Sequence, residues 1–516
     1  MKVLNFNVGL LGHVDSGKTS LAKVLSSVSS TAAFDKDPQS QERGITLDLG
    51  FSSFSSPVPA HLSDSKFDIV QFTLVDCPGH ASLIKTIIGG SQIIDLMILV
   101  IDVTKGFQTQ TSECLIIGEI TKKKLIVVLN KVDQLTDKIA LEKLTKRVRI
   151  TMDNTVFKGC PIVPASALNN DIKELTEALE KATFIPERNA EKPFLFAVDH
   201  CFALKGKGTI LTGTVLQGKA KLNDDIELPS IALIKKIKSI EVFRKPVETL
   251  VQGDRAGICV TQFDPKTLER GLACQVNYLP KVYAAIIDFN KVKYYKGSIS
   301  SKSVFHINIG YENVTGKIVL FSSLNNSDTS NTIDTEKEYM YIPEYDEAVD
   351  TDSSKLYALI EFSKPVLIAP NNLTIGARLD TPVNSNSCRL AFHGNVLLYT
   401  ALKNYAPTFL GGLNIYKEKY KKGTIDRIVS EYSLIGKNMF KKESNIDKFL
   451  GMKISLSSGE TGVIESTFGL SGKFRVQIPD GLKETTMGMS ADKNTIEIIL
   501  KYKRYIYDPN KKMVQT

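Results

Sequence analysis

The chain has 516 residues, and at about 100 to 200 residues per domain this length predicts about three to five domains. With 42% hydrophobic and 23% charged residues it has an ordinary soluble composition, and no uninterrupted apolar run reaches membrane-spanning length. The N-terminal apolar stretch is too short for a signal peptide, and the 7 cysteines form no C-x-x-C motif. We therefore expect no membrane association and a cytoplasmic location, and an additional nuclear pool stays open.

Residues 1–190 alternate apolar, strand-like runs with longer helical patterns, which predicts βαβ units around a parallel sheet. The first such run leads into "GHVDSGKT" at residues 12–19. A G-x-x-x-x-G-K-[ST] motif between a strand and a helix is typical of a phosphate-binding loop, in which Lys18 reaches the β/γ-phosphates and Thr19 coordinates Mg²⁺. The motif by itself allows either ATP or GTP. The residues that we expect to contact the nucleotide here are Asp15, Ser16, Gly17, Lys18, Thr19 and Ser20.

Two further segments are predicted to sense the γ-phosphate. "DCPGH" at 76–80 ends a strand, so that Asp76 could hold Mg²⁺ through water and Gly79 could move towards the phosphate. "ERGITLD" at 42–48 lies between the two motifs, where Thr46 could coordinate Mg²⁺ only while the γ-phosphate is present. These segments predict a nucleotide-dependent switch.

Two later motifs select the base. "NKVD" at 130–133 follows a strand, and a carboxylate at Asp133 would accept hydrogen bonds from two guanine nitrogens, a pair that adenine lacks. "SAL" at 166–168 can close the pocket with backbone N–H groups. The sequence therefore predicts GTP and GDP as ligands, bound in part by Asn130, Lys131, Asp133, Ser166, Ala167 and Leu168.

The rest of the chain is rich in strand patterns. Residues 191–280 carry short strands with Gly and Asp turns and predict a β-barrel. Residues 281–404 form a second strand-rich region with an insertion at about 322–355, where nine acidic residues against two lysines predict a solvated segment. Residues 405–516 mix strands with basic clusters and hold 19 Lys and Arg against 12 Asp and Glu, most of the net charge of +9.

The motif set resembles that of the translational GTPases, and together with "KGKGTILTGTVLQG" it resembles elongation factor Tu and its relatives. The resemblance implies a multidomain fold, in which an α/β P-loop GTPase domain precedes two β-barrels and, in this chain, a basic C-terminal domain that is mainly β. It also implies that His80 orients the water that attacks GTP. Val14 and Ile45 match the hydrophobic gate that holds this histidine away until the ribosome stimulates hydrolysis.

Three departures from elongation factor Tu resemble the selenocysteine-specific elongation factors, and the eukaryotic form in particular. Ser16 replaces a usual histidine, the segment from Ser20 to Arg43 is short, and a basic module follows Tyr405. This resemblance implies a monomer that delivers selenocysteinyl-tRNA to the ribosome at recoded UGA codons. It also implies communication with the selenocysteine insertion element of the message through a binding protein.

The resemblance places the selenocysteine pocket at Asp199, His200 and Arg255. A selenol is more acidic than a thiol, so a guanidinium and an imidazole would stabilise its anion, with Asp199 orienting the imidazole. Serine on the same tRNA is uncharged and would leave the cations unpaired. The alternative is a plain ion pair between Asp199 and Arg255 across barrel strands.

In the last module, basic and aromatic residues alternate in a way that suits RNA backbone contact and base stacking, although charge runs are also typical of solvated faces. The residues are Lys417, Lys419, Lys421, Lys422, Lys441, Lys442, Lys501, Lys503 and Arg504, interleaved with Tyr416, Tyr420, Phe440, Tyr502 and Tyr505. Two other functions stay open at this point. One is a general aminoacyl-tRNA carrier or initiation-type GTPase, and the other is a GTPase subunit that regulates a metabolic enzyme.

Overall fold

The computed structural model describes residues 2–515 except 27, 30–48, 80–83, 136, 205, 244, 269, 324–331, 347–354, 381–387, 443, 470–471, 489–495 and 509–512. The chain forms two compact units. The first holds residues 1–318 and 360–401, and the second holds residues 319–359 and 402–516.

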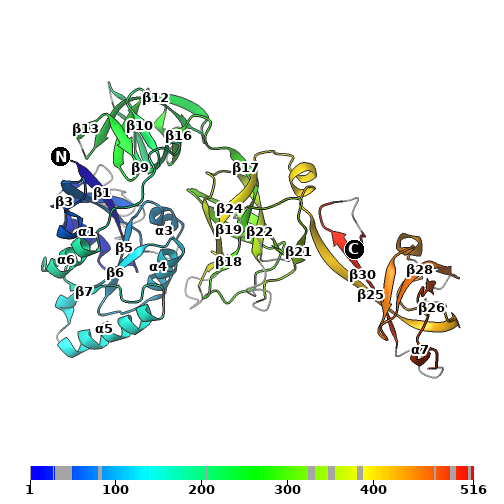
Figure 1. Cartoon of the computed structure of the whole chain (residues 1–516). Coiled ribbons are helices and arrows are strands. Elements are labelled where there is room, and N and C mark those ends of the chain that lie inside the picture. Colours follow the sequence, from blue (N-terminus) through cyan, green and yellow to red (C-terminus); the bar gives the residue numbers. More distant parts are fainter. Residues whose placement is uncertain are drawn as a thin grey trace. The chain divides into compact units, whose positions relative to one another are not determined.

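The first unit begins with a seven-stranded sheet in the order β2-β3-β4-β1-β5-β6-β7 (Figure 1). Strands β4, β1, β5, β6 and β7 are parallel, and β2 and β3 are added antiparallel at one edge. The parallel strands therefore end at one edge of the sheet, where ligands of such folds bind. The strands are β1 (Val3–Gly12), β2 (Val28–Ser29), β3 (Gly50–Pro57), β4 (Ile69–Asp76), β5 (Leu96–Asp102), β6 (Lys124–Asn130) and β7 (Ile162–Ala165).

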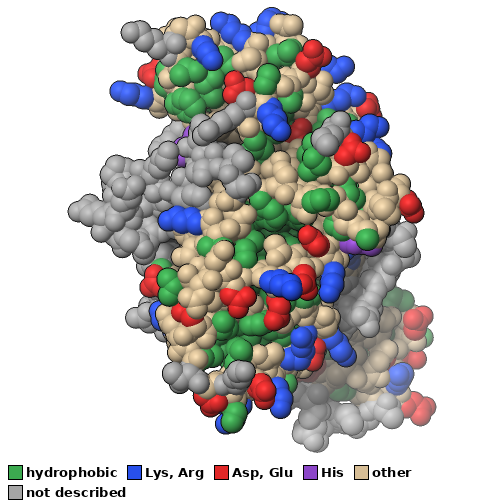
Figure 2. Space-filling view, turned by 90° about the vertical axis from the view of Figure 1, so that its left-hand side faces the viewer, with side chains coloured by type: hydrophobic (Ala, Val, Ile, Leu, Met, Phe, Trp, Pro, Cys, Tyr) green, Lys and Arg blue, Asp and Glu red, His purple; other side chains and the backbone are tan. Residues whose placement is uncertain are grey.

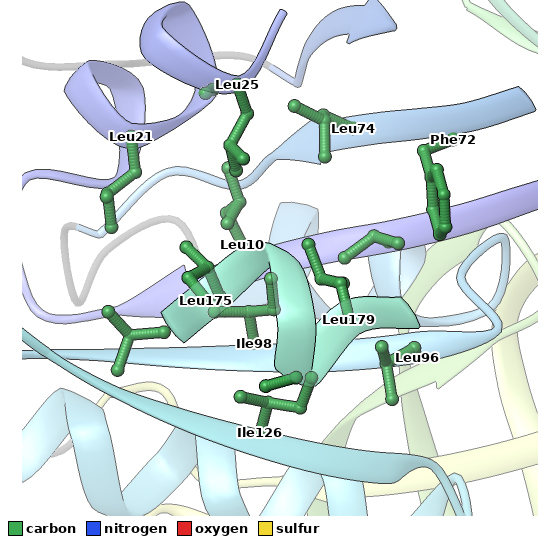
Figure 3. Close-up of a cluster of buried hydrophobic side chains, with 14 of the residues drawn as sticks. Leu10, Leu21, Leu25, Phe72, Leu74, Leu96, Ile98, Ile126, Leu175 and Leu179 are labelled. Atoms are coloured by element: carbon green, nitrogen blue, oxygen red, sulfur yellow. The ribbon is translucent and has the colours of Figure 1, made fainter. Parts of the chain in front are cut away.

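Helices cover this sheet because its central strands are apolar except at their ends and must be buried on both faces. Figure 3 shows how leucines of α1 and α6 lie over the strands, with Leu10 and Ile98 of the sheet fully buried beneath them. The helices are α1 (Lys18–Leu25), α3 (Ile84–Ser91), α4 (Thr109–Ile120), α5 (Lys138–Asp153) and α6 (Lys173–Ala182), with short turns η1 (Ala60–Leu62) and η3 (Val132–Gln134).

A β-barrel follows, in the strand order β11-β16-β8-β9-β15-β12-β13. The pairing of β11 with β12 closes it around a core that includes Phe196 and Ile258. A two-stranded ribbon of β10 and β14 accompanies the barrel. The elements are β8 (Leu195–Leu204), β9 (Gly208–Gln217), β10 (Lys219–Lys221), β11 (Asp225–Leu228), β12 (Leu233–Val242), β13 (Lys245–Val247), β14 (Thr249–Val251), β15 (Arg255–Val260), η4 (Pro265–Thr267) and β16 (Gly271–Gln275).

The next strands form a second closed barrel in the order β19-β23-β24-β17-β22-β20, because β20 also pairs with β19. Its elements are β17 (Lys281–Asp288), β18 (Asn290–Lys291), β19 (Val304–Ile309), β20 (Glu312–Ser323), β22 (Leu356–Leu367), β23 (Leu373–Ala377) and β24 (Leu390–Thr400).

The C-terminal strands close in the same way, in the order β25-β26-β29-β28-β27-β30 with β30 paired back to β25. Phe474 and Ile498 lie at the centre of their core. The elements are η5 (Ala406–Leu410), β25 (Ile415–Ser430), β26 (Ser433–Lys437), η6 (Ile446–Phe449), β27 (Lys453–Leu456), β28 (Thr461–Phe468), β29 (Lys473–Gln477), α7 (Glu484–Gly488) and β30 (Glu497–Tyr505). The predicted fold class, a P-loop GTPase domain with two β-barrels and a mainly β C-terminal domain, is confirmed.

The expectation of a solvated insertion at 322–355 was wrong for one short piece. Within the acidic insertion predicted to be solvated, β21 (Tyr339–Ile342) pairs with β20 and with β25, and Tyr339 is buried. The preceding residue, Glu338, forms an ion pair with Lys503 at 2.6 Å. The apolar run "YMYI" makes this short piece a strand, whereas the acidic composition of the whole segment masks it.

No helix in the described part of the chain is long and apolar enough to cross a membrane. Figure 2 shows basic and acidic side chains intermixed on the face that it presents. The net positive charge is therefore not gathered into a single-sign patch on that face.

A buried ion pair joins the α/β domain of residues 1–190 to the second barrel. Arg389, just before β24, donates from Nε and Nη2 to the two carboxylate oxygens of Glu113 in α4, at 2.7 and 2.6 Å. Both side chains are only 6% exposed. A two-pronged pair of this kind fixes both the distance and the angle between the two elements.

We expect Glu113→Ala to lower the free energy of unfolding by about 3–5 kcal/mol, because it removes this carboxylate from a buried guanidinium. Replacing both residues, as in Glu113→Leu with Arg389→Met, should recover most of that loss because no buried charge then remains. Urea unfolding of the single and double variants measures both values. A loss below about 1 kcal/mol in the single variant would show that the pair does not hold the domains together.

Candidate functional site: a nucleotide site and a charged barrel pocket

The P-loop lies where β1 ends and α1 begins. Gly17, with φ +91°, precedes the helix, and a Cβ at this position would collide with the side-chain amide of Asn130. Lys18 is buried, and its ammonium donates to the carbonyls of Gly12 and His13 at 3.1 and 2.6 Å. Burial lowers the pKa of Lys18. The first turn of α1 has no acidic residue, so its free N–H groups and helix dipole favour an anion.

The segment after β4 packs directly onto this loop. Thr19 Oγ1 donates to Asp76 Oδ2 at 2.6 Å, which places the two predicted Mg²⁺ ligands side by side. A Cβ on Gly79 would lie 2.5 Å from Lys18 Nζ and 2.7 Å from the backbone nitrogen of Val14, so only glycine allows this close approach. Val14 of the predicted gate is half-buried here. Its partner Ile45, the predicted ligand Thr46 and the predicted catalytic His80 lie outside the described residues.

The base-selecting motifs meet the P-loop at the same edge of the sheet. Asn130 Nδ2 donates to the carbonyl of Ser16 at 2.8 Å, and its Oδ1 accepts from the backbone N–H of Ala167 at 3.4 Å. The hydroxyl of Ser166 donates to Asp133 Oδ1. Asn130 is thus the bridge between three motifs that are more than 30 residues apart in the sequence.

The outer residues of the nucleotide site are exposed. Asp15 and Ser20 lie on the accessible side of the P-loop region, and the side chain of Leu168 is 82% exposed. Sequence reasoning missed Asp102, which ends β5 and holds Lys131 in an ion pair at 2.7 Å. The signal was present, because an aspartate directly after the apolar run "LMILVI" stands at the same sheet edge as Asp76 and Asn130.

A second cluster of charged residues lies in the first barrel. Between Val198 and His200 the register of β8 against β9 shifts, so Asp199 is the extra residue of a β-bulge. A bulge interrupts the strict alternation of side chains, and Asp199 and His200 therefore need not point to opposite faces of the strand. His200 lies opposite Thr212 and is half-buried.

Arg255 is the centre of this cluster. Its Nη1 donates to Asp199 Oδ2 and, at 3.4 Å, to Thr214 Oγ1. The guanidinium stacks on Phe51 of β3, with 3.1 Å between its central carbon and the ring centroid. Nε and Nη2 are buried and make no hydrogen bond with the described residues. Burial lowers the pKa of Arg255, whereas the neighbouring Asp199 raises it.

The loop that carries Arg255 is held by the GTPase domain. The side chain of Asn7 donates to the carbonyl of Gly253 at 3.1 Å, and Asn5 donates to Asp254. Arg188, in the linker between the domains, binds the carbonyl of Asn5 and Asp95 Oδ2, both at 2.8 Å. Its guanidinium occupies the space that a Cβ on Gly253 would need, and Gly253 has φ +92°. These contacts fix the base of Arg255 against β1.

The nine basic residues predicted to contact RNA in the last domain divide into three groups. Three are already paired with carboxylates: Lys422 with Glu497 at 2.8 Å, Lys501 with Glu418 at 3.0 Å and Lys503 with Glu338 at 2.6 Å. Lys417 lies 3.6 Å from the ring centroid of Tyr341, and Lys421 lies near the rings of Phe440 and Phe449. Among these nine, the exposed residues that form no ion pair with the described part of the chain are Lys419, Lys441, Lys442 and Arg504.

Family models match most of the chain in four segments. They are the elongation factor Tu GTP binding domain at residues 4–198, elongation factor Tu domain 2 at 208–273, the third domain of eukaryotic selenocysteine-specific elongation factors at 286–394, and the eEFSec C-terminal RIFT domain at 412–495.

Whole-chain relatives agree with these matches. The selenocysteine-specific elongation factor of Mus musculus is 45% identical over 577 aligned positions, covering 99% of both chains. That of Methanocaldococcus jannaschii is 31% identical, covering 92% of this chain and 94% of its own. The crystal structure of translation elongation factor SelB from Methanococcus maripaludis in complex with the GTP analogue GppNHp is also similar, with a TM-score of 0.74 and 26% sequence identity. The match covers 98% of this chain and 100% of that one.

The P-loop, the guanine motifs and the barrel that follows them define a translational GTPase, which binds guanine nucleotides and hydrolyses GTP. More narrowly, the chain belongs to the family of selenocysteine-specific elongation factors, and its domains are those of the eukaryotic branch. It is thus an elongation factor of selenocysteine incorporation.

We expect Asp133→Asn to change the base preference from GTP to xanthosine triphosphate. The amide loses the paired acceptor oxygens for guanine and gains a donor for the xanthine oxygen. Competition binding with the two nucleotides measures the preference, and Asp137→Asn, an exposed helix cap outside the site, is the matched control. Unchanged preference for GTP in Asp133→Asn would contradict the role of Asp133.

Proposed function

We propose that this chain, with GTP bound, carries selenocysteinyl-tRNA to the ribosome, and that Asp199, His200 and Arg255 recognise the selenocysteine side chain. The observation that supports this most strongly is the state of Arg255. Its guanidinium is buried, yet two of its nitrogens, Nε and Nη2, have no acceptor among the described residues. Buried cations without full pairing are costly, so such a group favours an anionic ligand.

The selenolate is an anion of suitable size for this role. It would accept hydrogen bonds from the free edge of Arg255, while Asp199 holds Nη1 on the other edge. The ring of Phe51 fixes the plane of the guanidinium, so little freedom is lost on binding. A serine hydroxyl carries no charge and would leave Arg255 unsatisfied, which disfavours seryl-tRNA. This charge dependence is also what disfavours a general aminoacyl-tRNA carrier.

Magnesium fits the nucleotide site. The hydroxyl of Thr19 and the carboxylate of Asp76 are adjacent oxygen donors, and oxygen is the ligand type that Mg²⁺ prefers. The described residues contain no group of three or more His, Cys, Asp or Glu that could hold a metal on its own, which agrees with an ion shared between few side chains and phosphates. Thr46 is the proposed third protein ligand. Bound Mg²⁺ would neutralise charge on the phosphates.

For hydrolysis, we assign the orientation of the attacking water to His80, with Val14 and Ile45 as the gate. Gly79, the residue before His80, packs against Lys18 and Val14, which supports this role. Catalysis of this kind is mainly positioning, so the intrinsic rate should be low until the ribosome acts.

The last domain is the proposed RNA-binding part of the chain. Because Lys422, Lys501 and Lys503 are paired with carboxylates, phosphate contact rests mainly on Lys419, Lys441, Lys442 and Arg504. Tyr420, with a side chain 55% exposed, is available for base stacking. The selenocysteine tRNA is the first proposed ligand. Communication with the selenocysteine insertion element through a binding protein is the second.

We expect Arg255→Ala to weaken the binding of selenocysteinyl-tRNA while changing that of the serine-charged tRNA much less. A hydrogen bond to a charged group contributes about 1.5–3 kcal/mol, so the selectivity ratio should fall by about one to two decades. Equilibrium binding of both tRNAs to the GTP form measures the ratio.

The matched control is Arg389→Ala, which removes another buried, ion-paired arginine far from the pocket in the sequence. It should lower the melting temperature without changing the selectivity ratio. If Arg255→Ala behaves in the same way, Asp199 and Arg255 form only a structural ion pair.

A further inference from the structure

A cavity of about 290 Å³ lies where the GTPase domain and both barrels of the first unit meet. The GTPase domain contributes part of α3, and the first barrel contributes Asp199 and Arg270. The second barrel contributes Asn308, Tyr311 and Glu312. Asp199 therefore contributes both to the charged barrel pocket and to this cavity, because it pairs with Arg255 and also lines the cavity.

Tyr311 brings to the cavity a hydrogen-bond donor that no other described residue uses. Its hydroxyl oxygen is buried and makes no hydrogen bond with the described residues. Burial, with the negative charge of Asp199 nearby, raises the pKa of Tyr311, so the phenol keeps its proton and can donate. The side-chain nitrogen of Asn308, which lines the same cavity, is also buried and makes no hydrogen bond with the described residues. Buried donors are normally satisfied, and a polar cavity of this size holds water.

Asp199 has the matching acceptor. Only its Oδ2 is engaged, by Arg255, and Oδ1 accepts no hydrogen bond from the described side chains. A carboxylate in a buried site gains stability from each further donor. The unused donor of Tyr311 and the unused acceptor of Asp199 thus line one cavity.

We propose that Tyr311 is a positioning residue of the selenocysteine pocket, whose hydroxyl donates to Asp199 across this cavity through a water molecule. The inference rests on the proposed function of Asp199 and Arg255. A carboxylate held by Tyr311 shares less of its negative charge with Arg255, and the guanidinium then keeps more positive potential for the selenolate. Through this contact the second barrel, which has no other residue in the predicted pocket, contributes to the choice of cargo.

A purely structural role for Tyr311 predicts something different. Its ring packs against the apolar cluster of Leu195, Leu272 and Leu367, and Tyr278 packs against the same cluster. Tyr278, however, uses its hydroxyl, which accepts from Gln217 Nε2 at 2.9 Å. If only the ring matters, removing the hydroxyl of Tyr311 should have no effect on cargo selection.

The test compares Tyr311→Phe with the matched control Tyr278→Phe in the full chain with GTP. The probes are selenocysteinyl-tRNA and the same tRNA charged with serine. We expect Tyr311→Phe to lower the selectivity ratio about three- to tenfold, with little change in the binding of the serine form. Tyr278→Phe should leave the ratio unchanged. Equal ratios in the two variants would overturn the proposal.

A double-variant cycle then shows whether Tyr311 acts through Asp199. In the Asp199→Asn background, Tyr311→Phe should cause no further loss of selectivity, because the carboxylate that it orients is gone. Full additivity of the two effects would also overturn the proposal. If Arg255→Ala lowers selectivity and Tyr311→Phe does not, only the role of Tyr311 fails. If neither does, the proposed pocket itself is wrong.

Discussion

Arg255 is buried at a point where parts of the chain far apart in sequence meet, and the proposed recognition of the cargo depends on that burial. Its cation is stacked on Phe51 of the GTPase domain and paired with Asp199 of the first barrel. A charge placed in such a site has lost most of its hydration, so whatever completes its pairing gains a strong interaction. The same guanidinium on the surface would discriminate poorly, because water would satisfy it equally well with either cargo.

The position of this cation is set from the GTPase side. Asn5 and Asn7 of β1 hold the loop before Arg255, and Arg188 fills the space left by Gly253. Strand β1 leads at its other end into the P-loop, where Lys18 and Thr19 lie. Phe51 belongs to β3, which pairs with the strand that ends at Asp76. The nucleotide site and the proposed cargo pocket therefore both rest on neighbouring strands of one sheet. A shift of β1 or β3 would therefore change the geometry of both sites.

Sequence reasoning recovered the parts of the molecule that follow local rules. The P-loop, the acidic strand end at Asp76 and the guanine motifs could be predicted because each is a short pattern at the end of a parallel strand, and such ends meet at one edge. The structure brings Lys18, Thr19, Asp76, Asn130 and Asp133 to that edge. The roles of His80, Ile45 and Thr46 remain predictions because these residues lie outside the described part of the chain.

Apart from Asp102, the residues that sequence reasoning missed act through contacts between domains. Phe51, Arg188 and Tyr311 stand in ordinary local patterns, and only the docking of separate domains gives them partners. The prediction of a solvated insertion failed at β21 for a related reason. The acidic average composition of 322–355 did not indicate that four of its residues form a strand. Likewise, basic clusters in the sequence did not reveal that Lys422, Lys501 and Lys503 are paired with carboxylates.

The central claim is that a buried, incompletely paired guanidinium selects an anionic cargo. Its most direct test is the rate at which the aminoacyl ester is hydrolysed when the full chain and GTP are added to selenocysteinyl-tRNA or to the same tRNA charged with serine. The account predicts that the selenocysteine ester is protected and that the serine ester decays at nearly its free rate. Equal protection of the two esters would contradict it, because a pocket built around Arg255 cannot treat a selenolate and a hydroxyl alike.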